Sequence, residues 1–376
     1  MPDPVYLDHA ATTPLRPEVR EAMMAVYAGR WGNPSSVHRF GREARAALED
    51  ARARFAAVVG ARAAEIVFTR GGTEADNLAV LGFSRRTGGR VACSMIEHSA
   101  VLRAAEAAGR PLLLPVSGDG VLDLGALDEA LDASPAVVAV MWASNETGAV
   151  QPVAEVAERC SERRACFHTD AVQALGKVPV RLDLVPAATA AFSAHKLGGP
   201  RGTGALFVRM GTRLEPLLHG GGQERGLRPG TEDVAGAVGL ALAAELAAAE
   251  REAEAPRLTA LRDRLEAGLR ERIDGMVVHA AGAERLPHIL ALSLPGTDPE
   301  LLLSGLDLEE IAASSGSACS SGAFRPSHVL LAMGVAPEVA RPSLRFSLGR
   351  ETTEREIQRV LDVLPPLAER LRAGPA

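Results

Sequence analysis

The sequence contains few cysteines, and their spacing excludes the common zinc and dithiol motifs. The 376 residues include four of them, at Cys93, Cys160, Cys166 and Cys319, and no two are spaced as C-x-x-C. Structural zinc sites and redox dithiols usually depend on that spacing. Cys93 lies in an apolar run, and Cys160 and Cys166 flank a charged turn, so we expect these three to be structural.

Long apolar runs and basic blocks are also missing. The longest apolar run, residues 234–244, has 11 residues, whereas a membrane-spanning helix needs roughly 18 or more. The N-terminal residues lack the basic and apolar segments of a signal peptide. The net charge is −6 with both signs mixed along the chain, and no basic stripe suggests nucleic acid. We therefore expect a cytoplasmic protein that binds neither membrane nor nucleic acid.

Lysine is scarce. Of 41 basic residues only Lys177 and Lys196 are lysines, and all others are arginine. A position that stays lysine can supply an amine that deprotonates and attacks a carbonyl, which a guanidinium cannot do. Lys196 follows Ser193 and His195 and precedes a Gly-Gly-Pro turn. This setting suits pyridoxal 5'-phosphate (PLP) held as a Schiff base. We expect Lys177 to be a solvated turn residue.

The pattern of apolar runs indicates an α/β fold. From about residue 60 to 210, short apolar runs alternate with helical stretches. Such alternation predicts βαβ units and a mostly parallel central sheet covered on both faces. The following stretch, residues 233–272, is rich in Ala, Leu, Glu and Arg. We predict two helices there, divided near Pro256.

The length predicts two domains. A chain of 376 residues is too long for a single small core, and its 47% apolar content is that of an ordinary globular protein. We place a large α/β domain at residues 13–255. Residues 1–12 and 256–376 then form a smaller α+β domain.

Polar residues follow several of the predicted strands. Thr73 lies in the Gly-Gly-Thr turn that opens a predicted helix, where backbone N–H groups can face an anion. Asp170 follows another strand and is our candidate partner for a protonated PLP ring nitrogen, with Gln173 near the phenolic oxygen. His98 and Asn145 follow two further strands. An ordinary turn, a helix-capping Asp170 and a structural His98 stay open as alternatives.

Two more residues stand out towards the C-terminus. Cys319 lies in a small, polar stretch without apolar periodicity, residues 314–323, where a thiol can act as a nucleophile. An incidental loop thiol is the alternative. Arg345 lies in an alternating, strand-like segment. An inward arginine needs an anion, and a substrate carboxylate would provide one as a bidentate pair.

Taken together, these motifs resemble the cysteine desulfurases of the class V aminotransferase group over nearly the whole chain. The matching segments are residues 6–14, 32–36, 97–98, 145–148, 170–173, 193–196, 220–226, 315–319 and 345–350. The resemblance implies a PLP-dependent transferase of fold type I, similar to aspartate aminotransferase. It also implies that L-cysteine is converted to L-alanine, with the sulfur left as a persulfide on Cys319.

The resemblance also implies roles for the other candidate residues. Lys196 would carry PLP and shuttle protons, and His98 would stack on its ring. The residues implied to bind the phosphate are Gly72, Thr73, Ser193 and His195, with Thr231 reaching the partner subunit of a homodimer. Asn145 would contact the cofactor, and Asn145 and Arg345 would hold the substrate carboxylate.

The spacing of 26 residues from Cys319 to Arg345 is similar to that of the long-loop group of the family. That group passes sulfur to iron–sulfur scaffold or thiolation proteins. No firm metal site is implied, although contact of Cys319 with a cluster on a docked scaffold stays open. The alternatives are a selenocysteine lyase, another class V aminotransferase or lyase, and a non-catalytic protein of the same fold.

Overall fold

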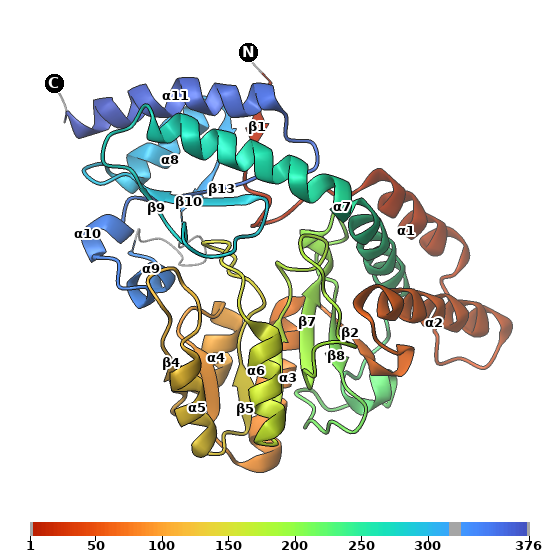
Figure 1. The fold of residues 1–376 in the computed structure, drawn as a ribbon. Coiled ribbons are helices and arrows are strands. Elements are labelled where there is room, and N and C mark those ends of the chain that lie inside the picture. The colour runs from red at the N-terminus through yellow and green to blue at the C-terminus, as the bar shows by residue number, and fades with distance from the viewer. Residues whose placement is uncertain (1–2, 316–324, 374–376) are drawn as a thin grey trace.

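The computed structural model describes residues 3–315 and 325–373 and builds them around two main sheets. We call the part around the seven-stranded sheet the larger unit. The part around the four-stranded sheet is the smaller unit, which lies at the top of Figure 1. Three short 3₁₀ turns are η1 (Ala63–Glu65), η2 (Ala194–Lys196) and η3 (Gln223–Gly226).

The larger unit has the predicted, mostly parallel sheet. Its strand order is β2-β8-β7-β6-β5-β3-β4, and β8 runs antiparallel to both of its neighbours. The pairs from β7 to β4 are all parallel. The strands are β2 (Ile66–Thr69), β3 (Val91–Ser94), β4 (Leu112–Leu114), β5 (Val137–Ala139), β6 (Phe167–Asp170), β7 (Thr189–Ser193) and β8 (Gly204–Val208).

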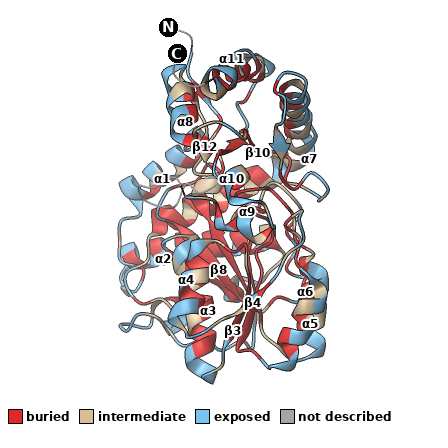
Figure 2. Cartoon of the chain, turned by 90° about the vertical axis from the view of Figure 1, so that its left-hand side faces the viewer, coloured by how far each residue is buried: buried red, intermediate tan, exposed pale blue. Residues whose placement is uncertain are grey.

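Helices cover both faces of this sheet, so its strands are buried, as Figure 2 shows. The apolar side chains of α3 (Gly72–Thr87) and α4 (Ser99–Ala107) pack in the core cluster on one face. The cluster on the other face takes side chains from α2 (Arg39–Val59), α5 (Leu124–Asp132), α6 (Val153–Glu162) and the first part of α7 (Val234–Arg270). Helix α1 (Pro17–Gly29) packs against α7.

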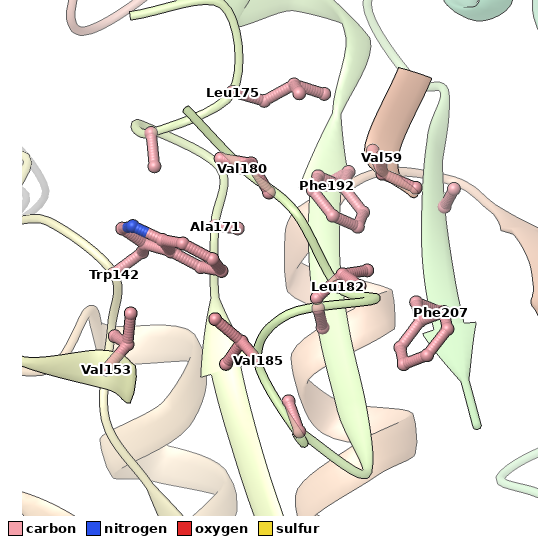
Figure 3. Close-up of a cluster of buried hydrophobic side chains, with 14 of the residues drawn as sticks. Val59, Trp142, Val153, Ala171, Leu175, Val180, Leu182, Val185, Phe192 and Phe207 are labelled. Carbon is pink, nitrogen blue, oxygen red and sulfur yellow. The ribbon is translucent and has the colours of Figure 1, made fainter. Parts of the chain in front are cut away.

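The core cluster that includes α2, α5, α6 and α7 extends to the loops that follow the central strands. In Figure 3, Trp142 lies near Val153 and Ala171, and Phe192 lies between Val59 and Val180. Ala171 and Phe192 flank the predicted site residues Asp170 and Ser193 in the sequence. Burial of these neighbours therefore fixes the ends of β6 and β7, since a packed core tolerates little displacement.

The smaller unit is an antiparallel sheet with helices on it. Its strand order is β12-β13-β10-β9, and a separate parallel pair joins β1 to β11. The strands are β1 (Val5–Tyr6), β9 (Val277–Val278), β10 (Ile289–Ser293), β11 (Ile311–Ala312), β12 (Ser314–Ser315) and β13 (Ser343–Ser347). The remaining helices are α8 (Pro299–Leu308), α9 (His328–Ala332), α10 (Pro337–Ala340) and α11 (Glu354–Arg372).

The predicted division of residues 233–272 into two helices is wrong. The structure has one helix, α7 (Val234–Arg270), with Pro256 inside it. Proline lacks an N–H and disfavours a helix interior, but both halves are anchored by packing. Residues such as Leu240 lie in the core of the larger unit, and residues such as Leu265 in that of the smaller. The helix thus connects the two units (Figure 1).

Candidate active site

The carboxyl ends of neighbouring strands bring most of the predicted residues to one edge of the large sheet. Strand β6 ends at Asp170, which is paired with Ala191 of β7, and β7 ends two residues later at Ser193. Turn η2 follows directly and ends at Lys196. Ligands of open α/β sheets bind at this edge. The strand ends therefore define the candidate site.

The start of α3 forms an anion cradle beside Ser193. Gly71 precedes the helix with a φ of +133°, a conformation open to glycine. A Cβ on Gly204 would lie 2.7 Å from the Cα of Gly71, and a Cβ on Gly71 would lie 4.0 Å from the Ser193 Oγ. Packing therefore requires glycine at position 204, whereas position 71 requires it because of its φ. The first N–H groups of α3, from Gly72 and Thr73 onward, carry positive partial charge suited to a phosphate.

Asp170 is buried, and burial raises the pKa of its carboxyl above the usual range. Charges on His98 and Lys196 and the N–H of Val172, which donates to Oδ1 at 2.8 Å, act in the opposite direction. The carboxyl thus lies within electrostatic range of two other predicted residues. A buried carboxyl of this kind suits a protonated heterocyclic nitrogen, because the pair restores its charge.

The N-terminal segment holds the lysine turn in place. The Lys196 amine donates to the carbonyl oxygens of Ala10 and Ala11 at 2.5 and 2.7 Å. The Gln173 side chain also donates to Ala10, at 2.9 Å, and His195 Nδ1 lies 3.1 Å from Thr12 Oγ1. The sequence motif at residues 6–14 was noted only as part of the resemblance. Its role as a clamp on Lys196 was missed, because nothing local predicts a contact across 186 residues.

His98 caps helix α4, and this fixes its tautomer. Its Nδ1 accepts the backbone N–H of Ala100 at 3.1 Å. A neutral imidazole that accepts at Nδ1 carries its proton on Nε2. In this conformation the ring is set to donate a proton from Nε2. The structural and functional interpretations of His98 are therefore compatible.

Sequence reasoning missed two further buried carboxyls, Asp76 and Glu97. Burial raises the pKa of both, Glu97 to about 8, and each also feels the charge of Asp170. Asp76 Oδ1 lies 3.2 Å from His168 Nε2. Glu97 Oε1 accepts from Ser94 Oγ at 2.5 Å and from the Met141 N–H at 2.8 Å. The position of Glu97 beside His98 was the only sequence signal.

Arg345 and Asn145 lie together, as the carboxylate-binding prediction requires. Arg345 Nη1 donates to the Asn145 carbonyl at 2.9 Å, and Nη2 pairs with Asp8 Oδ1 at 2.7 Å. Among the described residues, nothing accepts from the buried Arg345 Nε. The guanidinium therefore keeps one buried donor for an additional anion.

Cys319 lies outside the described residues, but strand β12, which precedes it in the sequence, is described. Strand β12 pairs with β13 so that Ser314 is directly opposite Arg345, and Ser315 is the last residue described before the gap. Cys319 follows Ser315 by four residues, which span at most about 14 Å when extended. Arg345 therefore lies next to the last residues described before Cys319 in the sequence.

Thr231 and Lys177 lie apart from the strand ends. Thr231 is exposed on the segment between η3 and α7, and its predicted contact with a partner subunit stays a prediction. The prediction for Lys177 is wrong: its side chain is half-buried, and burial and the charge of Arg16 lower its pKa to about 8. The turn before it, at Gly176, packs against Ala247 of α7, which keeps this lysine out of bulk solvent.

Comparisons with known proteins found similar sequences and structures over nearly the whole chain. The family model of the class V aminotransferases matches residues 5–360. A cysteine desulfurase IscS of Dictyoglomus turgidum is 44% identical over 98% of this chain and 95% of its own length. A cysteine desulfurase of Cereibacter sphaeroides is 45% identical over 98% and 97%.

Solved structures are similar over nearly the full length as well. A NifS-like protein from Rickettsia africae has a TM-score of 0.91 at 32% identity, covering 98% of this chain and all of that one. The structure of SspA in complex with cysteine has a TM-score of 0.80 at 31% identity, covering 92% and 98%.

Residues 3–315 and 325–373 contain neither a candidate metal site nor a candidate membrane-spanning helix. No group of three or more His, Cys, Asp or Glu side chains in these ranges is placed to hold a metal ion. None of the helices in them has the length and apolarity to span a bilayer.

Proposed function

This chain belongs to the cysteine desulfurases of the class V aminotransferase family, and we propose that Cys319 is the residue that receives the sulfur of L-cysteine. The protein is a PLP-dependent enzyme that removes sulfur from L-cysteine and leaves L-alanine. The observation that carries the role of Cys319 is the register of β12 on β13, with Ser314 opposite Arg345.

The residues present fit PLP. The glycine cradle at the start of α3 and the Ser193 hydroxyl suit its phosphate, and the buried Asp170 carboxyl suits its ring nitrogen. Lys196 would hold the cofactor covalently, with His98 against the ring. When bound, PLP supplies an electron sink that lets the α-proton of an amino acid leave and weakens the bond between Cβ and sulfur.

The remaining steps belong to side chains of this chain. Arg345 and Asn145 orient the substrate through its carboxylate, and the buried Arg345 Nε provides a donor for it. Asp170 keeps a proton at the ring nitrogen. The Lys196 amine would take the α-proton at Nζ, and the Nε2–H of His98 would serve as a proton donor.

Sulfur transfer then proceeds by attack of a thiolate. The Cys319 thiolate attacks the substrate sulfur, an S–S bond forms, and the Cβ–S bond breaks with its electron pair going to carbon. Protonation of that carbon completes alanine. The outer sulfur atom of the Cys319 persulfide is passed to an acceptor protein, such as an iron–sulfur scaffold in the cytoplasm. Cys319 must therefore reach both the substrate and the outside, which a tether of a few residues next to Arg345 allows.

The surface supports a homodimer. The scarce aromatic residues include Tyr27, Trp31 and Phe40, which are exposed together with Met24 and Val37 on α1, α2 and their connection. We call these five residues the α1–α2 patch. Trp31 and Phe40 stack on each other, and exposed apolar groups that gather in this way are typical of an association surface. Helix α2 also borders a hollow of about 550 Å³ that extends to Glu232, next to Thr231. A second subunit here would meet Thr231, as its predicted role requires.

Mass spectrometry tests the role of Cys319. The holoenzyme is incubated with L-cysteine without reductant, and Cys319 is examined for the added mass of one sulfur atom. We expect wild type to gain it and to form alanine, and Cys319→Ser to do neither at equal PLP content. Equal alanine formation by Cys319→Ser would overturn the proposal. Formation of a keto acid would favour a transaminase, and a preference for selenocysteine would favour a selenocysteine lyase.

A further inference from the structure

The two lysines of the chain line one small cavity between the units. This cavity has a volume of about 70 Å³, and Lys177, Lys196, Arg16 and Arg350 contribute to its wall. A neighbouring cavity of about 30 Å³ shares Lys177, Arg16 and Arg350 with it. His98, Asp170 and Ser193 line neither of them. The space is therefore distinct from the cofactor site, although Lys196 borders both.

The carboxylates around this cavity already have guanidinium partners. Glu250 takes a bidentate pair from Arg16, with distances of 2.8 and 2.7 Å. Glu254 takes another from Arg257, with distances of 3.0 and 2.8 Å. Glu351 is exposed and lies 3.3 Å from Arg350. Within the described part of the chain, no carboxylate lies within ion-pair distance of Lys177.

The charge count leaves one cation over. Apart from Lys196, which would hold the cofactor, the cations lining the two cavities are Arg16, Lys177 and Arg350, and Arg257 pairs with Glu254 from outside the lining. These four cations stand against three carboxylates, Glu250, Glu254 and Glu351. Lys177 also lowers the pKa of two neighbouring histidines, His9 and His288, in which burial is the first cause. His288 is buried, and among the described residues its Nδ1 has no hydrogen-bond partner. The region thus carries excess positive charge beside a buried histidine, and an anion would neutralise that charge.

Much of the remaining wall is apolar, although His9 and Thr13 also line it. Pro14, Leu15, Leu197 and Ala247 line the larger cavity beside its cations. An inorganic anion would leave that wall without a complementary surface, whereas a carboxylate with a short alkyl group would cover it. The single excess charge also matches one carboxylate.

We propose that this cavity binds a small monocarboxylate, with its oxygens on Lys177 and Arg350 and its alkyl group against Pro14 and Leu15. Lys177 belongs to the larger unit, on the segment after β6, and Arg350 follows β13 of the smaller unit. The ligand therefore joins the two units by charge-assisted hydrogen bonds. Its binding raises the pKa of Lys177, since an added negative charge favours the ammonium.

The scarcity of lysine makes a direct test possible. Reductive methylation of the holoenzyme with ¹³C-formaldehyde labels Lys177 and the N-terminal amine, because the cofactor blocks Lys196. The dimethyl-ammonium of Lys177 keeps its charge and gives a separate NMR signal. Sodium propionate is titrated at constant ionic strength against sodium chloride. We expect a saturable shift of the Lys177 signal and a higher pKa with propionate, and neither effect with chloride.

Matched variants locate the second contact. Arg350→Gln should weaken propionate binding about tenfold or more, as expected for loss of a charge-assisted hydrogen bond. Arg355→Gln is the control, since Arg355 is 80% exposed and pairs with Asp3 away from the cavity. A non-saturable shift, an equal response to chloride, or an unchanged affinity in Arg350→Gln would overturn the proposal.

A second measurement does not depend on labelling. Propionate should raise the midpoint of thermal unfolding of wild type and of Lys177→Arg, which keeps the positive charge, but not that of Lys177→Met. An equal rise in Lys177→Met would refute binding at this lysine. Because neither assay involves turnover, its outcome is independent of the role proposed for Cys319.

Discussion

The buried carboxyl of Glu97 makes the stability of the protein depend on pH. Its pKa is raised to about 8 by burial, with the hydrogen bonds from Ser94 and Met141 acting in the opposite direction. The unfolded chain loses this proton near pH 4.5, the ordinary pKa of a glutamate, whereas the folded chain holds it until about pH 8. Stability from this group is therefore complete below the unfolded pKa and is lost as pH rises through the folded one.

We predict that Glu97→Gln removes this loss. The amide oxygen can still accept from Ser94 and Met141, and the amide replaces a protonated carboxyl of the same shape. The free energy of unfolding of the variant relative to wild type should increase by on the order of 2 kcal/mol between pH 5 and pH 8.5. Denaturant unfolding at both pH values measures it, and a constant difference between them would contradict the neutral state of Glu97.

The thiols should differ in reactivity. Burial raises the pKa of Cys93 and Cys160 to about 12, and it also raises that of Cys166. Because the thiolate is the reactive form, all three should react slowly in the native protein. We predict that iodoacetamide at neutral pH modifies Cys319 first, as peptide mass spectrometry would show. Labelling of Cys166 at the same rate would contradict this, and labelling after denaturation is the control.

The site residues that could be predicted were those whose residue type or position after a strand is informative by itself. Lys196 was found because lysine is scarce, and Asp170 because it ends an apolar strand. The pairing of Arg345 with Asp8 joins positions 337 residues apart and leaves no local trace. Lys177 was misjudged for the same reason, since the turn before it, at Gly176, packs against Ala247 of α7, and the charge of Arg16 acts on it from a distant part of the chain.

At the scale of elements, the start of α3 carries a specific requirement for glycine. Gly71 has φ of +133° and ψ of −179°, a region that other residues avoid. We predict that Gly71→Ala destabilises the protein by about 1–3 kcal/mol and weakens PLP binding about tenfold through loss of a phosphate contact. Equilibrium dialysis of PLP and denaturant unfolding measure the two effects.

The end of the same helix provides the control. Gly88 also has a positive φ, of +67°, with open space around it. Gly88→Ala should cost about 1 kcal/mol of stability and leave the affinity for PLP unchanged. If both variants lose affinity for PLP equally, the loss results from destabilisation of α3, and the predicted role of Gly71 in phosphate binding is wrong.

Helix α7 shows where local rules fail at this scale. Pro256 was a sound reason to expect a break, since proline removes one helical hydrogen bond. The helix continues because one half is packed in each core cluster, with Leu240 on one side and Leu265 on the other. The alternation of strands and helices was predictable, because each element shows its own periodicity. The continuity of α7 was not, since it depends on both cores at once.

At the scale of the whole molecule, the site is assembled from distant segments. The N-terminal segment clamps Lys196 through Ala10 and Ala11, and the smaller unit supplies Arg345. Since the N-terminal strand β1 pairs with β11 of the smaller unit, a shift of that unit would move both contacts. The two units and the site are therefore coupled mechanically.

We expect the α1–α2 patch to lie in the contact between two subunits of a dimer. The rings of Trp31 and Phe40 are stacked with centroids 4.9 Å apart, and Trp31 is 67% exposed. A charge placed at the centre of an apolar interface is strongly unfavourable unless it is paired. We predict that Trp31→Glu converts a dimer into monomers in sedimentation velocity, and that PLP is held less tightly because Thr231 loses its partner. Leu308→Glu, on α8 where Leu308 is 85% exposed, should remain dimeric. A Trp31→Glu variant that sediments as a dimer would place the subunit contact elsewhere on the surface.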